Sequence, residues 1–376
     1  MLIDKIKKNT LYPMHMPGHK RNTMLLSNSF PYEIDITEIH GFDDLRYQQA
    51  ELGKTADLAA RLYESNKAFM LVNGSTVGIL TAIGTLANRG DKILFAKSCH
   101  RSVHNAVELF GLKPIYIKTK TNEKSDIECS ITPEMINEAL EKESDIKLIV
   151  VTSPSYEGVI SDVKTITDAA HKKNISVLVD SAHGAHLGFS DKLPENATKS
   201  GADVVVMSLH KTLPALTQCS LMHVCSNRVD IDKLHSMLFI LQTSSPSYVL
   251  MASIDYCLRL LETSGSELFE KYMQLLTEFY KQTEDLKNLT VINPFDNDFH
   301  KSHPDFYDLD PGKIVVVTKN TSSGKYALAD ILRNEYEIEL EASHQNHAIA
   351  MTSICDTPEG IARLATALRE LDYRKK

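Results

Sequence analysis

The chain has 376 residues, which is enough for one large domain and a smaller one. Hydrophobic residues make up 43% and charged residues 24%, so the composition is that of an ordinary folded globular protein. The net charge of −8 and the sequence pI near 6.0 argue against a general nucleic-acid-binding surface or an anionic-membrane surface.

The cysteines and the N-terminus indicate where the protein resides. None of the six cysteines forms a CxxC pair, and a chain of this length does not need disulfides to fold, so we expect free thiols in a reducing compartment. Residues 1–10 lack the apolar core of a signal peptide. No apolar run approaches the roughly 20 residues that a membrane-spanning helix needs. We therefore expect a cytoplasmic protein.

Strand and helix patterns alternate through the first two thirds of the chain. The runs 148–151 (LIVV) and 204–207 (VVVM) are apolar without alternation, which is typical of parallel strands buried on both faces. We expect strands at 68–72, 92–96, 114–117, 148–152, 176–180, 204–208 and 219–224, and helices at 74–86, 101–110, 132–141 and 163–172. This order predicts an α/β fold with a mostly parallel seven-stranded sheet and helices on both faces.

The last third of the chain predicts a small α+β domain. The pattern is helical over 229–261, and the polar segment 293–312 is interpreted as a long loop that could serve as a lid. The other expected elements are a helix from 266, a strand at 314–318, a helix from Ser323, a strand at 338–340, an apolar stretch near Ile349 and a helix after Pro358. We divide the chain into an N-terminal segment over 1–50, a large domain over 51–262 and a small domain over 263–376.

Ligands of such sheets bind at the carboxyl ends of the strands, and the first informative residues lie at such an end. Asn73 follows a strand, and Gly74, Ser75 and Thr76 open a helix. Exposed N–H groups at the helix start, together with two hydroxyls, would make a phosphate cradle. The same residue types also cap helices generally, and no Walker A lysine follows them.

Two later strand ends carry ionisable side chains. Asp180 could pair with a protonated ring nitrogen or simply cap a loop, and Lys211 could form an imine with an aldehyde cofactor if burial lowers its pKa. Most lysines are merely solvated, so neither residue is decisive alone. The order of phosphate cradle, acid and lysine, each after a strand, predicts a pyridoxal-phosphate (PLP) site.

With these residues in place, the chain resembles the fold-type-I PLP enzymes, which have the aspartate-aminotransferase-like fold. Within that group it is similar to the bacterial ornithine/lysine/arginine decarboxylases. Longer members of that family have an N-terminal wing and a further C-terminal region, so this chain would be a short form. The matching segments are 16–20 (MPGHK), 35–38 (DITE) with 41–45 (GFDDL), 73–76 (NGST), 100–104 (HRSVH), 153–158 (SPSYEG), 180–186 (DSAHGAH), 208–214 (SLHKTLP) and 243–248 (TSSPSY).

The resemblance implies a role for individual residues. Lys211 would hold PLP as an imine, Asp180 would pair with the pyridinium nitrogen and His100 would lie over the ring, so these three are the expected catalytic residues. The large domain would also bind the cofactor through Gly74, Ser75, Thr76, Ser155, His183, Ser208, His210, Ser244 and Ser245. The last two would reach the phosphate of a neighbouring subunit, because the resemblance implies a homodimer with shared active sites.

The fold alone does not determine the reaction, because PLP enzymes can break different bonds of the same amino acid. Aminotransferases of this fold usually clamp the substrate carboxylate with an arginine, and the counterpart stretch 342–352 contains none. We therefore expect a decarboxylase of arginine, lysine or ornithine that yields carbon dioxide and a polyamine or its precursor. Lys211 or His100 would reprotonate the product carbon. The alternatives are an aminotransferase or lyase acting on another amino acid, and a PLP-binding protein without turnover.

A basic substrate also needs an anion at its far end. The resemblance points to Glu38, Asp43 and Asp44 in the N-terminal segment, although these acids could equally form a subunit contact. His100 and His104 have the i,i+4 spacing of metal ligands, but no third ligand is evident, so we expect no metal. We expect structural hydrogen bonds for His104 and His186.

Overall fold

A computed structural model describes residues 1–9, 14, 16, 17, 19–22, 24, 29–318 and 327–374 of the protein. Gly18 of the 16–20 segment and the expected helix start at Ser323 lie outside these residues. Within the described residues, no helix is long and apolar enough to cross a membrane.

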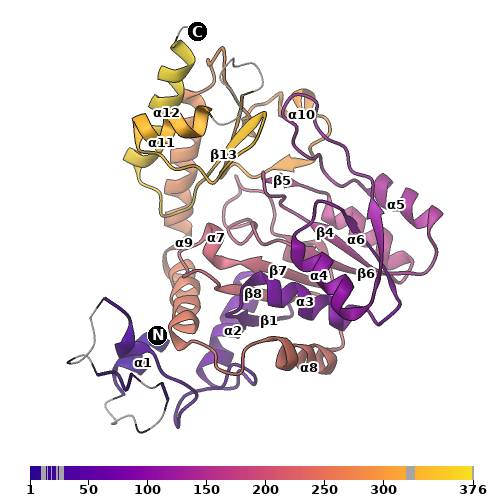
Figure 1. The fold of residues 1–376 in the computed structure, drawn as a ribbon, viewed down its shortest axis with the longest axis vertical. Helices are drawn as coiled ribbons and strands as arrows, with labels where there is room; N and C mark the ends of the chain where they lie inside the picture. The colour runs from indigo at the N-terminus through magenta and orange to yellow at the C-terminus, as the bar shows by residue number, and fades with distance from the viewer. Residues whose placement is uncertain are drawn as a thin grey trace.

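The centre of the molecule is a seven-stranded sheet in which only β8 runs antiparallel to its neighbours. The predicted mostly parallel seven-stranded sheet is confirmed (Figure 1). In spatial order the strands are β1 (Lys67–Leu71), β8 (Ser220–Val224), β7 (Val204–Ser208), β6 (Ser176–Asp180), β4 (Ile146–Thr152), β2 (Lys92–Ala96) and β3 (Lys113–Ile117).

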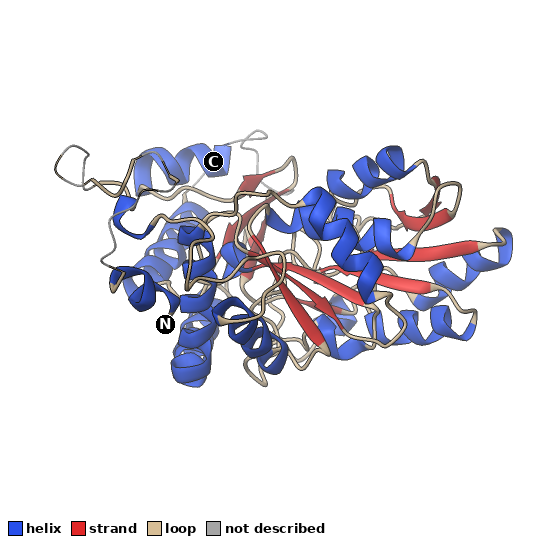
Figure 2. Ribbon diagram, turned by 90° about the horizontal axis from the view of Figure 1, so that it is seen from below, coloured by secondary structure: helices blue, strands red, loops and turns tan. Residues whose placement is uncertain are grey.

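Helices cover both faces of this sheet, as predicted (Figure 2). Alternate strand residues point to opposite faces, so Val177 and Val179 of β6 pack in one core while Leu178 packs in the other. The first core contains α2 (Glu51–Leu62), α5 (Pro133–Lys142), α6 (Val163–Lys172) and α9 (Tyr248–Gln282), and the second contains α3 (Gly74–Leu86), α4 (Arg101–Phe110) and α8 (Ile231–Leu241). The remaining short elements are α1 (Leu2–Lys7), η1 (Tyr32–Ile34), η2 (Ala197–Ser200) and α7 (Leu209–Thr212).

The C-terminal part forms a second, antiparallel sheet with helices beside it, which agrees with the predicted small α+β unit. Its strands are β9 (Thr290–Val291), β11 (Lys313–Val317), β12 (Ala342–Ser343) and β13 (His347–Met351), and its helices are α11 (Ala327–Tyr336) and α12 (Pro358–Tyr373). The predicted strand at 338–340 is wrong. Glu337 ends α11 in a left-handed conformation, and pairing with β13 begins only at Ala342.

The helices between the large sheet and the small sheet begin and end at other residues than predicted. The expected helix over 229–261 is broken between α8 and α9, in a segment that contains Pro246, which lacks a backbone N–H donor. The expected helix from 266 is instead part of α9, which runs continuously from the large sheet to α12 (Figure 1). The proposed boundary between residues 262 and 263 therefore falls inside a helix.

The prediction of a long loop over 293–312 is also wrong. This segment contains α10 (Phe299–Ser302) and β10 (Asp308–Leu309), which pairs with β5 (Val159–Ile160). Its aromatic residues Phe299 and Phe306 are buried in a small third core. These buried anchors do not suit a lid that opens, and the segment instead leads directly into β11.

Candidate active site

The phosphate cradle lies at the start of α3. Asn73 does not cap this helix with its side chain, which instead accepts a hydrogen bond from the Thr243 N–H at 3.1 Å. Gly74 has a φ of +71°, and no atom lies within 4 Å of where a Cβ would be. The hydroxyls of Ser75 and Ser208 lie 2.7 Å apart. The start of this 13-residue helix has no side-chain cap; although the Gly74 N–H donates to the Gln218 carbonyl oxygen at 3.0 Å, the remaining first-turn N–H groups and the two hydroxyls suit a phosphate.

Asp180 and Lys211 lie next to this cradle at the ends of adjacent strands. Asp180 ends β6 and is buried, and Lys211 lies on α7 directly after β7. Burial raises the pKa of Asp180, although the Ala182 N–H and the charges of His100 and Lys211 oppose that shift. Burial also lowers the pKa of Lys211, against the charges of Asp180 and Glu341. A cationic ring nitrogen beside Asp180 would offset the cost of its buried charge.

His183 lies between two lysines. Its Nε2 is 3.0 Å from the Nζ of Lys211, and its Nδ1 is 2.8 Å from the Nζ of Lys313. Lys313 is the first residue of β11 and is completely buried; its Nζ lies 5.4 Å from the centroid of the Tyr156 ring. The small sheet therefore inserts a second lysine into the site, which the sequence analysis did not predict.

The protonation states of these three residues depend on one another. Burial, followed by the charges of Lys313 and Lys211, lowers the pKa of His183 far below its usual range, so the ring is neutral. A neutral imidazole has one N–H and one lone pair. When the Lys313 ammonium donates to Nδ1, the N–H at Nε2 donates to Lys211, whose Nζ must then be a neutral amine. That is the form in which lysine attacks an aldehyde.

Replacement of Lys313 by methionine should stabilise the cofactor-free protein at neutral pH. Burial lowers the pKa of Lys313 from 10.5 to about 8, so the folded state binds fewer protons than the unfolded state between these values. The cost of the buried charge is fully present below about pH 8 and disappears as the pH rises through about 10.5. A shift of this size corresponds to about 3 kcal/mol of unfolding free energy. Urea unfolding at several pH values measures the difference.

The matched control is Lys271→Met, because Lys271 is an exposed lysine paired with Glu267 on α9. This control should change the free energy of unfolding by less than about 0.5 kcal/mol. A Lys313→Met variant that is less stable than the wild type near neutral pH would show that the lysine makes a net stabilising interaction.

The other predicted cofactor residues take varied positions. His100 is the N-cap of α4 and is exposed, with its Nδ1 2.8 Å from the Ser102 hydroxyl. The Ser155 hydroxyl donates to Glu157 at 2.9 Å, and the His210 Nδ1 lies 2.9 Å from the Cys219 carbonyl oxygen. The Ser155 hydroxyl hydrogen and the His210 Nδ1 are therefore engaged within the protein. A contact with the cofactor would have to use another atom of these two side chains.

Three further predicted residues are exposed on the surface of the chain: Thr76 in the first turn of α3, and Ser244 and Ser245 in the loop before α9. The bond between Thr243 and Asn73 holds that loop beside the cradle. Of the two histidines expected to be structural, His186 pairs with Asp310 at 3.0 Å, and the Nε2 of His104 lies 3.1 Å from the Lys97 carbonyl oxygen.

The carboxylates of the three predicted substrate acids differ in their hydrogen-bond and ion-pair partners. Asp43 accepts backbone N–H bonds from the start of α2, and Asp44 is paired with Arg46. Glu38 instead has a buried carboxylate oxygen that has no hydrogen-bond partner among the described residues. All three lie beside Tyr248, the first residue of α9, whereas the acids whose charges act on Lys211 are Asp180 and Glu341.

The residues missed by the sequence analysis belong to long-range contacts. The Tyr156 hydroxyl donates to Glu341 at 2.8 Å, and its ring packs edge-on against His183. A signal for Lys313 existed, since a lysine opens the otherwise apolar strand KIVVV. Arg333 and Arg363 of the small unit are exposed and paired with acids of the same unit.

These residues fit PLP. The uncapped helix start with its hydroxyls suits the phosphate, the buried Asp180 suits the pyridinium nitrogen, and Lys211 has the lowered pKa that covalent capture of an aldehyde requires. The fold and the site together define a PLP-dependent enzyme of fold type I. The solved alanine–glyoxylate aminotransferase from Nostoc sp. is similar in fold, with a TM-score of 0.66, 16% identity and 86% of each chain covered.

The chain belongs to the Orn/Lys/Arg decarboxylase family, because the model of that family's major domain matches residues 2–334. It is 31% identical to an arginine decarboxylase of Bacillus anthracis over 376 residues, which covers 98% of this chain and 75% of the relative. The solved lysine decarboxylase LdcF of Francisella novicida has a similar fold, with a TM-score of 0.83 at 19% identity. That match covers 98% of this chain but only 59% of the lysine decarboxylase chain.

Proposed function

We propose that this protein is a PLP-dependent decarboxylase of a basic amino acid, with arginine as the first substrate to test. The observation that carries the proposal is the convergence of Lys211, Asp180 and the phosphate cradle in a member of the Orn/Lys/Arg decarboxylase family. The choice of arginine rests on relatives such as the arginine decarboxylase of Bacillus anthracis. The product would be a polyamine or its precursor.

When bound, PLP supplies an aldehyde that captures the substrate amine and a cationic ring that accepts the electrons of the broken bond. Side chains and backbone groups of the protein would hold the cofactor and move protons. Asp180 would keep the ring nitrogen protonated, the start of α3 would hold the phosphate, and Lys211 or His100 would return a proton to the substrate α-carbon. His183 would exchange protons with Lys211, because its Nε2 lies 3.0 Å from that amine.

The test is to supply arginine, lysine and ornithine separately to the purified PLP-loaded protein and to measure carbon dioxide and the product amine. We expect one of the three to yield equal amounts of both. A keto acid in place of the amine would identify an aminotransferase. Formation of neither product from these or other common amino acids would leave a PLP-binding protein without turnover and would refute the proposal.

Substrate recognition would depend on Glu38. One buried oxygen of Glu38 has no hydrogen-bond partner in the described part of the chain and is suited to a guanidinium or ammonium group, whereas Asp43 and Asp44 are already occupied. We expect Glu38→Gln to lower kcat/KM about 10- to 100-fold, which is the size of one hydrogen bond to a charged group. The loss should fall mainly on KM, because the far end of the substrate does not change during the reaction.

The control for this prediction is Asp44→Asn, since the Asp44 carboxylate is occupied by Arg46. Steady-state kinetics of both variants with the preferred substrate provide the comparison. Equal effects of the two substitutions would assign the acidic segment to a subunit contact.

We also propose a homodimer in which the N-terminal segment over 1–50 and the loop before α9 complete the active site of the partner. Ser244 and Ser245 are exposed and could reach a phosphate on another subunit. Phe239 and Ile240 expose 58% and 68% of their surface on α8, and Arg46 lies over the rings of Phe239 and Tyr47. An exposed apolar surface of this kind is typical of an interface.

Two further proposals concern the organisation and location of the protein. The large domain over 51–262 would carry the cofactor and the small domain over 263–376 would supply Lys313, with α9 joining the two. The cysteines are all free, which fits the reducing conditions of the cytoplasm.

A further inference from the structure

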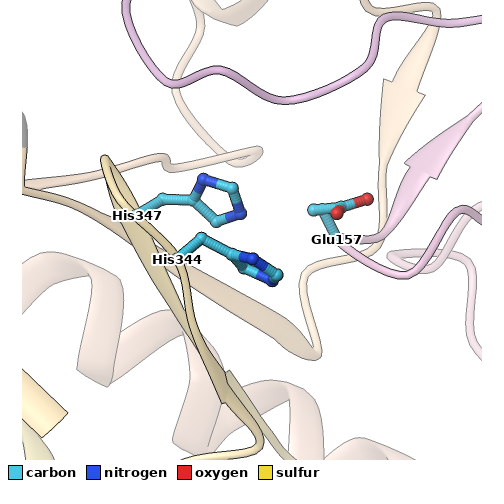
Figure 3. Close-up of side chains that lie close together, drawn as sticks. All are labelled: Glu157, His344 and His347. Atoms are coloured by element: carbon cyan, nitrogen blue, oxygen red, sulfur yellow. The ribbon is translucent and has the colours of Figure 1, made fainter. Parts of the chain in front are cut away.

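Three side chains with metal-binding donor atoms meet where the small sheet faces the loop after β4. These are Glu157, His344 and His347, and their donor atoms all lie within 4.8 Å of one another. Figure 3 shows the two imidazoles on the β12–β13 hairpin and the Glu157 carboxylate on the opposite loop, extending toward the same space. The residues come from parts of the chain separated by nearly 200 positions, so only the tertiary structure brings them together.

His347 is the most informative member of this group. It is only 4% exposed, and its Nδ1 lies 2.9 Å from the Ser125 carbonyl oxygen, so Nδ1 must carry the proton. The other nitrogen, Nε2, therefore has a lone pair, yet it is buried without a hydrogen-bond partner among the described residues. A histidine that donates one N–H to a backbone carbonyl and presents the other nitrogen is the usual form of a metal ligand.

The other two side chains are held in compatible positions. The backbone N–H of His344 donates to the His347 carbonyl at 2.8 Å, which closes the hairpin turn and brings the ring centroids to 4.7 Å. One oxygen of Glu157 accepts a hydrogen bond from the Ser155 hydroxyl, which leaves the other oxygen available.

We propose that Glu157, His344 and His347 bind a divalent transition-metal ion such as Zn²⁺. Two imidazoles and one carboxylate match the ligand preference of Zn²⁺ rather than that of Mg²⁺ or Ca²⁺. Ligand atoms around a tetrahedral zinc ion with bonds of about 2.1 Å lie about 3.4 Å apart, so the three side chains must close by little more than 1 Å. His344 is exposed and Glu157 is half-buried, so both have room to make this movement.

The metal would serve as a clamp between the loop after β4 of the large sheet and the β12–β13 hairpin of the small sheet. Glu157 follows Ser155 and Tyr156, and the Tyr156 hydroxyl already bonds to Glu341 beside the hairpin. A bound ion would hold this loop against β12 and β13, close to His183 and Lys313. Glu157 also lines a cavity of about 530 Å³, and His344 is exposed, so an ion can reach two of the three ligands from solvent. Three protein ligands leave a fourth position for water.

The experiment measures Zn²⁺ binding to the full-length PLP-loaded protein by equilibrium dialysis, after free PLP has been removed because it also binds metals. We expect one ion per chain in the wild type and an affinity lower by about 100-fold or more in His344→Ala and Glu157→Gln, since losing a direct ligand costs more than losing a residue that only orients a ligand. Zn²⁺ should also raise the melting temperature of the wild type but not of His344→Ala.

The matched control is His300→Ala, which removes an exposed histidine on α10 and should bind Zn²⁺ like the wild type. Because His344 is exposed as well, its loss should leave folding intact, which circular dichroism would verify. The proposal is overturned if the wild type binds no Zn²⁺, or if His344→Ala and Glu157→Gln bind it as tightly as His300→Ala does. This readout does not depend on decarboxylation, so it is separate from the test of the proposed function.

Discussion

Lys211→Ala should abolish turnover and remove the visible absorption band of lysine-bound PLP. The half-buried Lys211 amine lies 3.0 Å from His183, and its lowered pKa favours the neutral form that bonds covalently to the cofactor. The same amine is a candidate for proton return to the substrate. Loss of both roles should reduce kcat at least about 1,000-fold, since a proton-transfer residue alone contributes about 100- to 10,000-fold. Absorption spectroscopy and amine quantification measure the two effects.

Two further variants separate the possible roles of the lysine. Lys211→Arg keeps a long nitrogen-bearing side chain but cannot form the covalent bond, so it should lose the band as the alanine variant does. Lys271→Ala changes an exposed lysine of α9 and should keep both the band and the activity. Borohydride reduction followed by peptide mapping should place the cofactor on Lys211. Cofactor on another lysine, such as Lys313, would refute the assignment.

Asp180→Asn should give the second-largest loss, about 100- to 1,000-fold in kcat, which is typical for removal of one preorganised electrostatic group. Asparagine is nearly isosteric but neutral, so it cannot keep the ring nitrogen protonated. Because burial raises the pKa of Asp180, the substitution also removes a costly buried charge and should leave the cofactor-free protein at least as stable as the wild type. Steady-state kinetics test the expected loss of kcat, and thermal unfolding tests the expected retention of stability.

The control for Asp180→Asn is Asp255→Asn, which alters another buried carboxylate. Asp255 accepts hydrogen bonds from the Leu2 backbone and the Thr55 hydroxyl and is paired with Arg259, so its loss should lower stability while the folded enzyme keeps its kcat. If Asp180→Asn retained full activity, the role of Asp180 as the partner of the ring nitrogen would be excluded.

Local pattern was enough to predict the large sheet. Most of its strands are apolar on both faces, and α4, α5 and α6 each begin with a capping side chain, so the positions of these strands and helices are encoded over short distances. The small unit was predicted less well. The 338–340 strand failed because the left-handed residue Glu337 delays pairing until Ala342, and the 293–312 loop failed because its buried phenylalanines stand among polar neighbours.

The sequence by itself determined the parallel sheet and the positions of Gly74, Asp180 and Lys211 at strand ends, because the carboxyl ends of parallel strands meet at one edge. It also carried the motifs of the family. The tertiary structure decided what surrounds these residues. It brought Lys313 from β11 to His183 and assembled Glu157 with His344 and His347. It also gave Asp43 and Asp44 partners but left one buried oxygen of Glu38 without a hydrogen bond from any residue that the structure describes. Such contacts join residues far apart in the chain, so their geometry depends on how two separately patterned sheets pack together, which no local pattern encodes.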